Sequence, residues 1–173
     1  IWTGNFTFSS LLIALPCLIF AEFTDYLDGH YARKNNEVSD FGKLFDPFAD
    51  VILHLTTFVC FMKSANPEIS YLPVVILLLI MLREFSQNFL RMVAAKKGVA
   101  IAARKGGKFK TVMYVVSEFY ALFLEILVRT DNIPSSWQTL KTVSLVLFIV
   151  CVVCSYVSFI DYLVHFGSTL KGE

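Results

Sequence analysis

The feature that most constrains this chain is a run of nineteen residues, 142–160, without a single charged side chain. A run of this length is about what an α-helix needs to cross the hydrocarbon core of a bilayer. The whole sequence is also apolar: 56% of its 173 residues are hydrophobic, 17% are charged, and the mean hydropathy is +0.64. These values are atypical of soluble domains and predict an integral membrane protein.

Further segments are apolar enough to be interpreted as spanning helices. They are residues 6–23, 45–62, 69–82 with a continuation to Leu90, and 111–128. The last contains Glu118 and Glu125, which we expect to face protein because ionisable groups at membrane depth are costly. The sequence therefore predicts an all-α polytopic transmembrane helix bundle with five spanning helices, forming a single domain over residues 1–173.

The basic residues predict the orientation of this bundle. Seven of the fifteen Lys and Arg residues lie within residues 91–110, which contain no acid. Such loops are cytoplasmic, and Arg33 and Lys43 fall on the same side by alternation. Ile1 would then lie outside without an initiator Met or cytoplasmic leader before it, so we expect an earlier helix to be missing from this sequence. We expect no nucleic-acid partner.

Four aspartates, Asp25, Asp28, Asp46 and Asp50, lie between or within the first hydrophobic segments. Residues three or four apart share one face of a helix, so two facing helices would bring all four carboxylates together. Four anions so close repel one another unless cations neutralise them, and carboxylate oxygens are ligands that hard divalent cations prefer. We therefore predict a site for two divalent cations, Mg²⁺ or Mn²⁺.

Small residues accompany the aspartates. Gly29, Ala32 and Gly42 would let a flat group, or another helix, approach the backbone closely. The alternative interpretation is a helix contact in which the acids pair with basic residues such as Arg33. One acid and one base would suit that alternative, whereas four acids at helix-face spacing favour the metal site.

The pattern Asp-x2-Asp-Gly-x2-Ala-Arg-x8-Gly-x3-Asp-x3-Asp, from Asp25 to Asp50, resembles the signature of the CDP-alcohol phosphatidyltransferase family at every position. Known members are six-helix membrane enzymes, commonly homodimers, that transfer a phosphatidyl or similar group from a CDP-linked donor to an alcohol and release CMP. By this resemblance, we expect the family's first helices to be missing from this sequence. The resemblance implies these roles: metal ligands Asp25, Asp28, Asp46 and Asp50; catalytic base Asp50; donor-binding residues Asp25, Gly29, Ala32, Arg33 and Gly42.

A second group of polar residues predicts a site for another phosphate. It consists of Arg83, Arg91, Lys108, Lys110 and Thr111. The two arginines are eight residues apart on roughly one helix face, and the other three lie at the start of a helix, which favours anions. The alternatives are inside-positive topology for the loop and, for Arg83, pairing with Glu84 or Glu118. Arg-Glu, Leu-Arg and Gly-Lys-x-Lys-Thr resemble the bacterial branch of the family whose acceptor is sn-glycerol 3-phosphate.

The resemblance thus implies an enzyme of phospholipid and phosphatidylglycerol biosynthesis in the bacterial cytoplasmic membrane. It would transfer the phosphatidyl group of CDP-diacylglycerol to sn-glycerol 3-phosphate, from a cavity at the cytoplasmic side. Cardiolipin and phosphatidylinositol-phosphate synthesis stay open, because the acceptor motifs are short. Two other classes are less favoured: intramembrane prenyltransferases place their aspartate motifs in separate halves, and cation transporters spread their ligands over several helices, often as repeats.

Overall fold

The computed structural model describes residues 13, 15–21, 23–24, 27, 40–64, 66, 68–98 and 105–171. Its helices are α2 (Asp40–Cys60), α3 (Val74–Lys96), α4 (Lys105–Arg129) and α5 (Trp137–Lys171). The described positions among residues 13–27 are also helical, and the described ranges contain no strand. The prediction of an all-α fold is confirmed for these residues.

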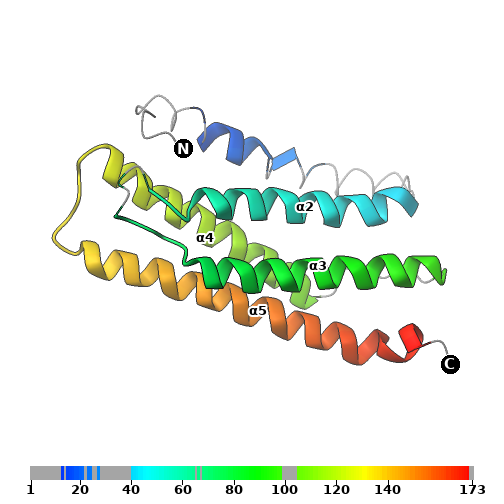
Figure 1. Ribbon diagram of the computed structural model, residues 1–173. Coiled ribbons are helices and arrows are strands. Elements are labelled where there is room, and N and C mark those ends of the chain that lie inside the picture. Colours follow the sequence, from blue (N-terminus) through cyan, green and yellow to red (C-terminus); the bar gives the residue numbers. More distant parts are fainter. Residues whose placement is uncertain are drawn as a thin grey trace.

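Successive helices run in alternating directions (Figure 1). The α2–α3 and α4–α5 connections lie at one end of the bundle, and the start of α2, the end of α3 and the start of α4 lie towards the other. We call this second end the basic end, because Lys96, Lys97 and Lys108 are exposed there. Helices α3 and α4 each contact α5, and each also contacts α2. The basic residues therefore lie at the end where α2 begins, and Asp46 and Asp50 are the seventh and eleventh of its 21 residues.

The helix ends follow local signals in the sequence. Helix α3 begins directly after Pro73, which has no amide proton to leave unpaired at a helix start. Two residues after its last residue, Gly98 has a φ of +74°, a conformation that glycine adopts without a steric penalty. Helix α2 begins at Asp40, before the start predicted from hydrophobicity, so Pro47 lies inside the helix and costs it one backbone hydrogen bond.

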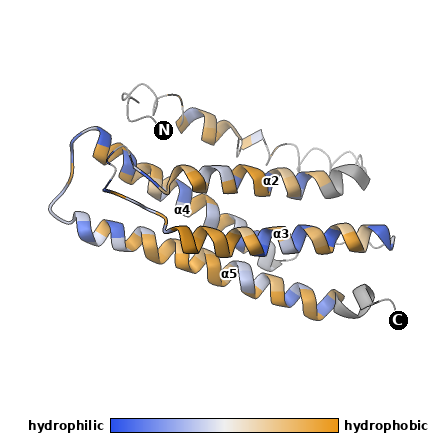
Figure 2. Cartoon of the chain, viewed as in Figure 1, coloured by the Kyte–Doolittle hydropathy of each residue, from blue (hydrophilic) through white to orange (hydrophobic). Residues whose placement is uncertain are grey.

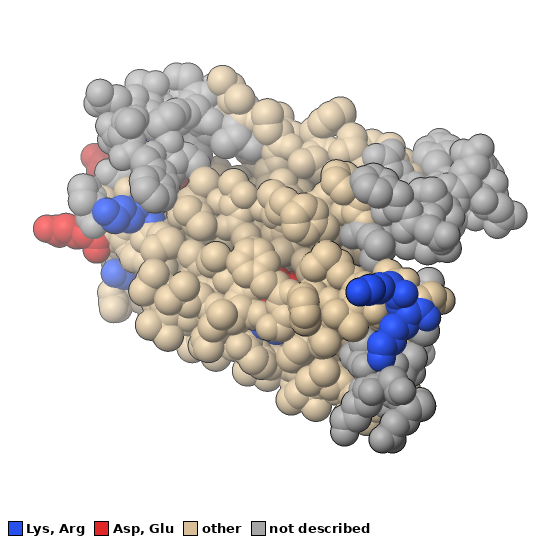
Figure 3. All heavy atoms as spheres, turned by 45° about the vertical axis from the view of Figure 1, so that its right-hand side comes forward, with Lys and Arg blue, Asp and Glu red and all other residues tan. Residues whose placement is uncertain are grey.

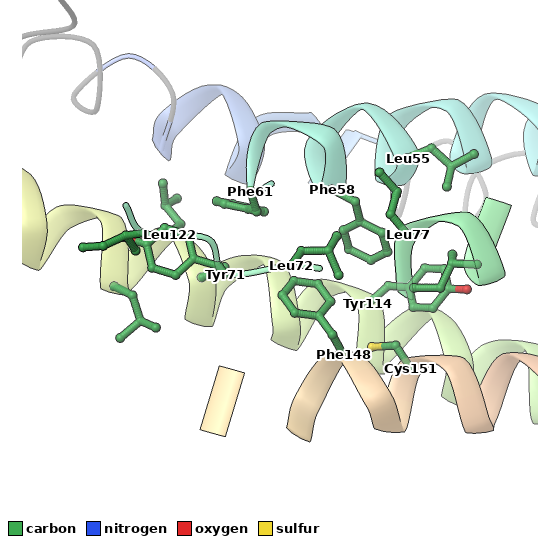
Figure 4. Close-up of a cluster of buried hydrophobic side chains, with 14 of the residues drawn as sticks. Leu55, Phe58, Phe61, Tyr71, Leu72, Leu77, Tyr114, Leu122, Phe148 and Cys151 are labelled. Carbon is green, nitrogen blue, oxygen red and sulfur yellow. The ribbon is translucent and has the colours of Figure 1, made fainter. Parts of the chain in front are cut away.

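Large aromatic side chains form the centre of the bundle (Figure 4). Phe58 of α2, Tyr114 of α4 and Phe148 of α5 are fully buried. The Phe58 ring meets the Tyr114 and Phe148 rings edge-on, with centroids 5.2 and 5.3 Å apart. Edge-to-face contacts are favoured because the ring edge is positive and the face negative. Leu77 of α3 is buried in the same cluster, so all these helices share one core.

Among the described residues, two helical stretches are long and apolar enough to cross a membrane: Gly106–Arg129 and Trp137–Phe166. Many of their exposed side chains are apolar, such as Val164, which is 75% exposed. Figure 2 shows that α5 is hydrophobic along most of its length. Figure 3 shows a broad uncharged band with charged side chains gathered towards its two ends. Helices α2 and α3 each carry four charged side chains, and in α3 two of them, Arg83 and Glu84, are buried inside the bundle. The total of five spanning helices stays a prediction.

Glu125 of α4 is the centre of a hydrogen-bonded cluster at the end of the bundle opposite the basic end. Its Oε2 accepts hydrogen bonds from Ser64 Oγ at 2.6 Å and Tyr71 Oη at 3.0 Å, and its Oε1 accepts one from Arg129 Nε at 2.6 Å. Glu118, two turns earlier, is fully buried. The prediction that Glu118 and Glu125 face protein is therefore confirmed.

Candidate active site

Two of the four predicted metal ligands lie on one face of α2. Asp46 and Asp50 are one turn apart; Asp46 is exposed, and the Asp50 side chain keeps 25% of its surface accessible. Asp25 and Asp28 lie outside the described residues, and the described part of the chain contains no group of three or more His, Cys, Asp or Glu side chains placed to hold a metal ion. Asp46 and Asp50 offer hard oxygen donors that fit half of the predicted site.

The predicted donor-binding residues are mostly beyond what the structure describes. Gly29, Ala32 and Arg33, like Asp25, lie outside the described residues. Gly42 lies in the first turn of α2, one turn before Asp46. The donor site therefore stays a prediction.

Asp50 begins a chain of polar side chains that crosses from α2 to α4. His54, one turn after Asp50, has its Nε2 3.3 Å from Asp50 Oδ1, without hydrogen-bond geometry. Its Nδ1 lies 2.9 Å from Glu118 Oε1. Both His54 and Glu118 are buried. Our reading of the sequence missed this connection, although the i, i+4 spacing of Asp50 and His54 was a usable signal.

Glu84 of α3 is the centre of a second buried cluster. Its Oε1 accepts hydrogen bonds, each 2.8 Å long, from Arg83 Nη1, Lys110 Nζ and Tyr114 Oη. The Arg83 Nε also donates to the Ser155 carbonyl at 2.7 Å, which ties α3 to α5. Two of the predicted acceptor-binding cations are thus held by one carboxylate, and Arg83 pairs with Glu84 rather than with Glu118.

The other predicted acceptor residues differ in their surroundings. Arg91 is partly buried, and its Nε has no hydrogen-bond partner among the described residues. Its guanidinium is within electrostatic range of Asp50, Glu84 and Tyr162. Lys108 is exposed, and the Thr111 hydroxyl donates to the Gly107 carbonyl at 3.3 Å. Arg91 is therefore the residue of this group whose partly buried guanidinium keeps an unpaired donor among the described residues.

Polar side chains around Arg91 were not predicted from the sequence. Gln87 Oε1, Asn88 Nδ2 and Tyr162 Oη are buried and, like Arg91 Nε, lack a hydrogen-bond partner within the described ranges. Buried polar groups are normally paired, so the unpaired groups around Arg91 are available to bind a ligand or water. Arg83, Gln87 and Arg91 follow one another at intervals of four, a helix-face pattern that could have revealed Gln87.

A family model describing CDP-alcohol phosphatidyltransferases matches residues 5–157, most of the chain. The chain belongs to this family, and with the two apolar helices found among its described residues it is a membrane protein. The enzyme class that the aspartate signature implied is thereby confirmed, since members of this family are phosphatidyltransferases.

Relatives similar to this chain include three proteins that bear the name CDP-diacylglycerol–glycerol-3-phosphate 3-phosphatidyltransferase. The Treponema pallidum protein is 38% identical over 154 residues, which are 88% of this chain and 69% of that protein. The Bacillus subtilis protein is 36% identical over 57% of this chain and 49% of its own length. The Rickettsia felis protein is 36% identical over 69% of this chain and 62% of its own length. The chain thus spans about half to two thirds of these relatives. Among solved structures, no significant match was found.

Proposed function

We propose that this chain transfers the phosphatidyl group of CDP-diacylglycerol to sn-glycerol 3-phosphate, which yields phosphatidylglycerophosphate and CMP. One observation carries the proposal: the complete aspartate signature ends in Asp46 and Asp50, which share one face of α2 in the half that starts at the basic end. The names of the relatives support the choice of donor and acceptor.

In this reaction the four aspartates hold two divalent cations, Mg²⁺ or Mn²⁺. When bound, such cations neutralise charge on the pyrophosphate of the donor and ease displacement at phosphorus. Asp50 accepts the proton of the acceptor's hydroxyl group while the oxygen of that hydroxyl bonds to the phosphatidyl phosphorus. The bond from that phosphorus to the CMP oxygen breaks. A carboxylate can act as this base when it reaches the hydroxyl directly or through one water.

The donor is bound by the small and charged residues of the aspartate signature, namely Asp25, Gly29, Ala32, Arg33 and Gly42. We expect Ala32→Leu to raise the apparent Kd for CDP-diacylglycerol at least tenfold, because the added side chain would occupy space that the cytidine group needs. Donor binding to the purified protein, measured together with its thermal midpoint, checks this. A folded variant with unchanged donor affinity would assign Ala32 to helix packing instead.

The acceptor phosphate is bound at the basic end. Arg83 and Lys110 carry two positive charges against the single negative charge of Glu84, so their cluster keeps an excess positive charge. Arg91, Lys108 and Thr111 add a partly buried guanidinium, an exposed ammonium and a hydroxyl. Of these, Arg91 has the clearest free donor, since its Nε is unpartnered within the described residues.

We expect Arg91→Ala to raise the KM for glycerol 3-phosphate about ten- to a hundredfold. A charge-assisted hydrogen bond contributes about 1.5–3 kcal/mol, and each factor of ten corresponds to about 1.4 kcal/mol. The KM for CDP-diacylglycerol should change little, because its phosphates are held elsewhere. Lys96→Ala is the matched control on α3, since Lys96 is exposed and is expected to contribute only to the orientation of the protein in the membrane. An unchanged acceptor KM in Arg91→Ala would remove Arg91 from the site.

The protein lies in the bacterial cytoplasmic membrane, with the basic end on the cytoplasmic side, and acts as a homodimer. The excess of Lys and Arg in residues 91–110 supports this orientation. The homodimer rests on the known members of the family alone.

The reaction is tested by following CMP release from CDP-diacylglycerol by purified protein in detergent, with and without glycerol 3-phosphate and Mg²⁺. We expect release only when all three are present. A prenyltransferase or a cation transporter would release no CMP under any of these conditions.

A further inference from the structure

We propose that His54 is a positioning residue for Asp50 and that Glu118 holds it in place from the neighbouring helix. The inference depends on the proposed function in one respect, namely that Asp50 binds metal and accepts the proton. The three residues come from α2 and α4, and the His54–Glu118 contact joins positions 64 residues apart in the sequence.

The surroundings of His54 fix the orientation of its ring. The ring packs edge-on against Tyr114, with centroids 5.5 Å apart and planes at 86°, and lies 6.4 Å from the Phe58 ring. A carboxylate oxygen accepts hydrogen bonds, so Nδ1–H donates to Glu118 at 2.9 Å. With that bond made and the ring enclosed, Nε2 faces Asp50 at 3.3 Å from Oδ1, which is an ion-pair distance without hydrogen-bond geometry.

Packing alone does not account for this arrangement. Burying an imidazole and a carboxylate costs free energy that an apolar pair of similar size would avoid. The buried carboxylate of Glu125 differs from Glu118 in this respect, because it accepts hydrogen bonds from Arg129, Ser64 and Tyr71 at the far end of the bundle. The Glu118–His54 chain instead ends on Asp50, which is partly accessible and belongs to the aspartate signature.

Partners that orient metal-binding side chains typically change metal affinity or activity by about 10–100-fold when they are removed. We therefore expect His54→Ala to weaken Mn²⁺ binding by about 10–100-fold and to lower kcat for CMP release by a similar factor. The KM values for donor and acceptor should stay within about threefold, because His54 is expected to act through Asp50 and to touch neither substrate.

The experiment compares Mn²⁺ titrations and CMP-release kinetics of the full chain in detergent for a set of variants. Glu118→Ala should reproduce the loss seen in His54→Ala, and the double variant should lose no more than His54→Ala alone, since Glu118 acts only through His54. Glu118→Gln keeps an oxygen that can accept the Nδ1–H bond and should restore most of the affinity. Glu125→Ala is the matched control, a buried carboxylate on the same helix that does not contact Asp50, and its folded fraction should bind Mn²⁺ normally.

Wild-type Mn²⁺ affinity in both His54→Ala and Glu118→Ala would overturn the inference, as would losses that add in the double variant. If one alanine variant does not fold, His54→Asn replaces His54→Ala, or Glu118→Leu replaces Glu118→Ala, in the same comparison. The titration does not need turnover, so its result stands even if the wild-type protein releases no CMP with glycerol 3-phosphate. That second result would instead contradict the proposed function.

Discussion

Asp50→Asn is expected to lower the rate of CMP release by about a thousandfold or more. The amide has almost the same size as the carboxylate, but it carries no negative charge for a cation and cannot accept the hydroxyl proton. General base catalysis alone contributes about 10²–10⁴-fold, and one metal ligand is lost as well. Asp46→Asn should also abolish turnover, through weaker metal binding. The measurement is single-turnover CMP release at saturating donor, acceptor and Mg²⁺.

The two variants should differ in what they still bind. Asp50→Asn is expected to keep measurable CDP-diacylglycerol binding and part of its Mn²⁺ binding, since the other ligands remain. Asp131→Asn is a suitable control, because Asp131 is exposed after α4 at the opposite end, and asparagine also tolerates its positive φ of 55°. Substantial turnover by Asp50→Asn would refute its role as the base.

Glu84→Ala is expected to cause the largest loss of stability. Arg83, Lys110 and Tyr114 all donate to Glu84 Oε1, so removing the carboxylate leaves two buried cations and a hydroxyl without their shared partner. Breaking a buried ion pair in this way costs about 3–5 kcal/mol. At about 2–4 °C per kcal/mol for a chain of this size, the thermal midpoint in detergent should fall by about 6 °C or more.

Glu68→Ala provides the control for this change, because Glu68 is an exposed acid in the α2–α3 connection and its loss should matter little. A double-mutant cycle with Glu84→Met and Lys110→Met isolates the pairing. The double variant should lose less stability than the sum of the two single variants, since each single variant leaves the other charge unpaired. Additive losses would show that the Glu84–Lys110 pair does not stabilise the bundle.

Hydrophobicity located the helices well but not their ends. Residues 142–160 mark the centre of α5, which nevertheless continues to Lys171 through polar positions such as Asp161 and His165. Backbone hydrogen bonds do not depend on side-chain polarity, so a spanning helix can extend beyond its apolar run into water. The start of α3 was predicted at Ile69, five residues early, although Pro73 was a visible signal for the boundary.

The candidate site was predictable only where its residues lie close together in the sequence. The spacing of Asp46 and Asp50 on α2 follows from helix periodicity. The contacts of Glu84 and His54 do not follow from helix periodicity. Lys110 is 26 residues from Glu84, and Glu118 is 64 residues from His54. Which buried acid meets which buried base depends on how the helices pack. A single sequence does not encode that choice in any local pattern, and so the pairing of Arg83 with Glu84 was one of several open alternatives.

Competition between acceptors shows which alcohol receives the phosphatidyl group. CMP release from CDP-diacylglycerol would be followed with glycerol 3-phosphate, inositol 1-phosphate, phosphatidylglycerol and free glycerol supplied together, and the lipid products would be identified. We predict that phosphatidylglycerophosphate forms in clear preference to the other products, because the positively charged basic end suits an acceptor that carries its own phosphate. Preferential formation of cardiolipin or of phosphatidylinositol phosphate would contradict the assignment of glycerol 3-phosphate as the acceptor.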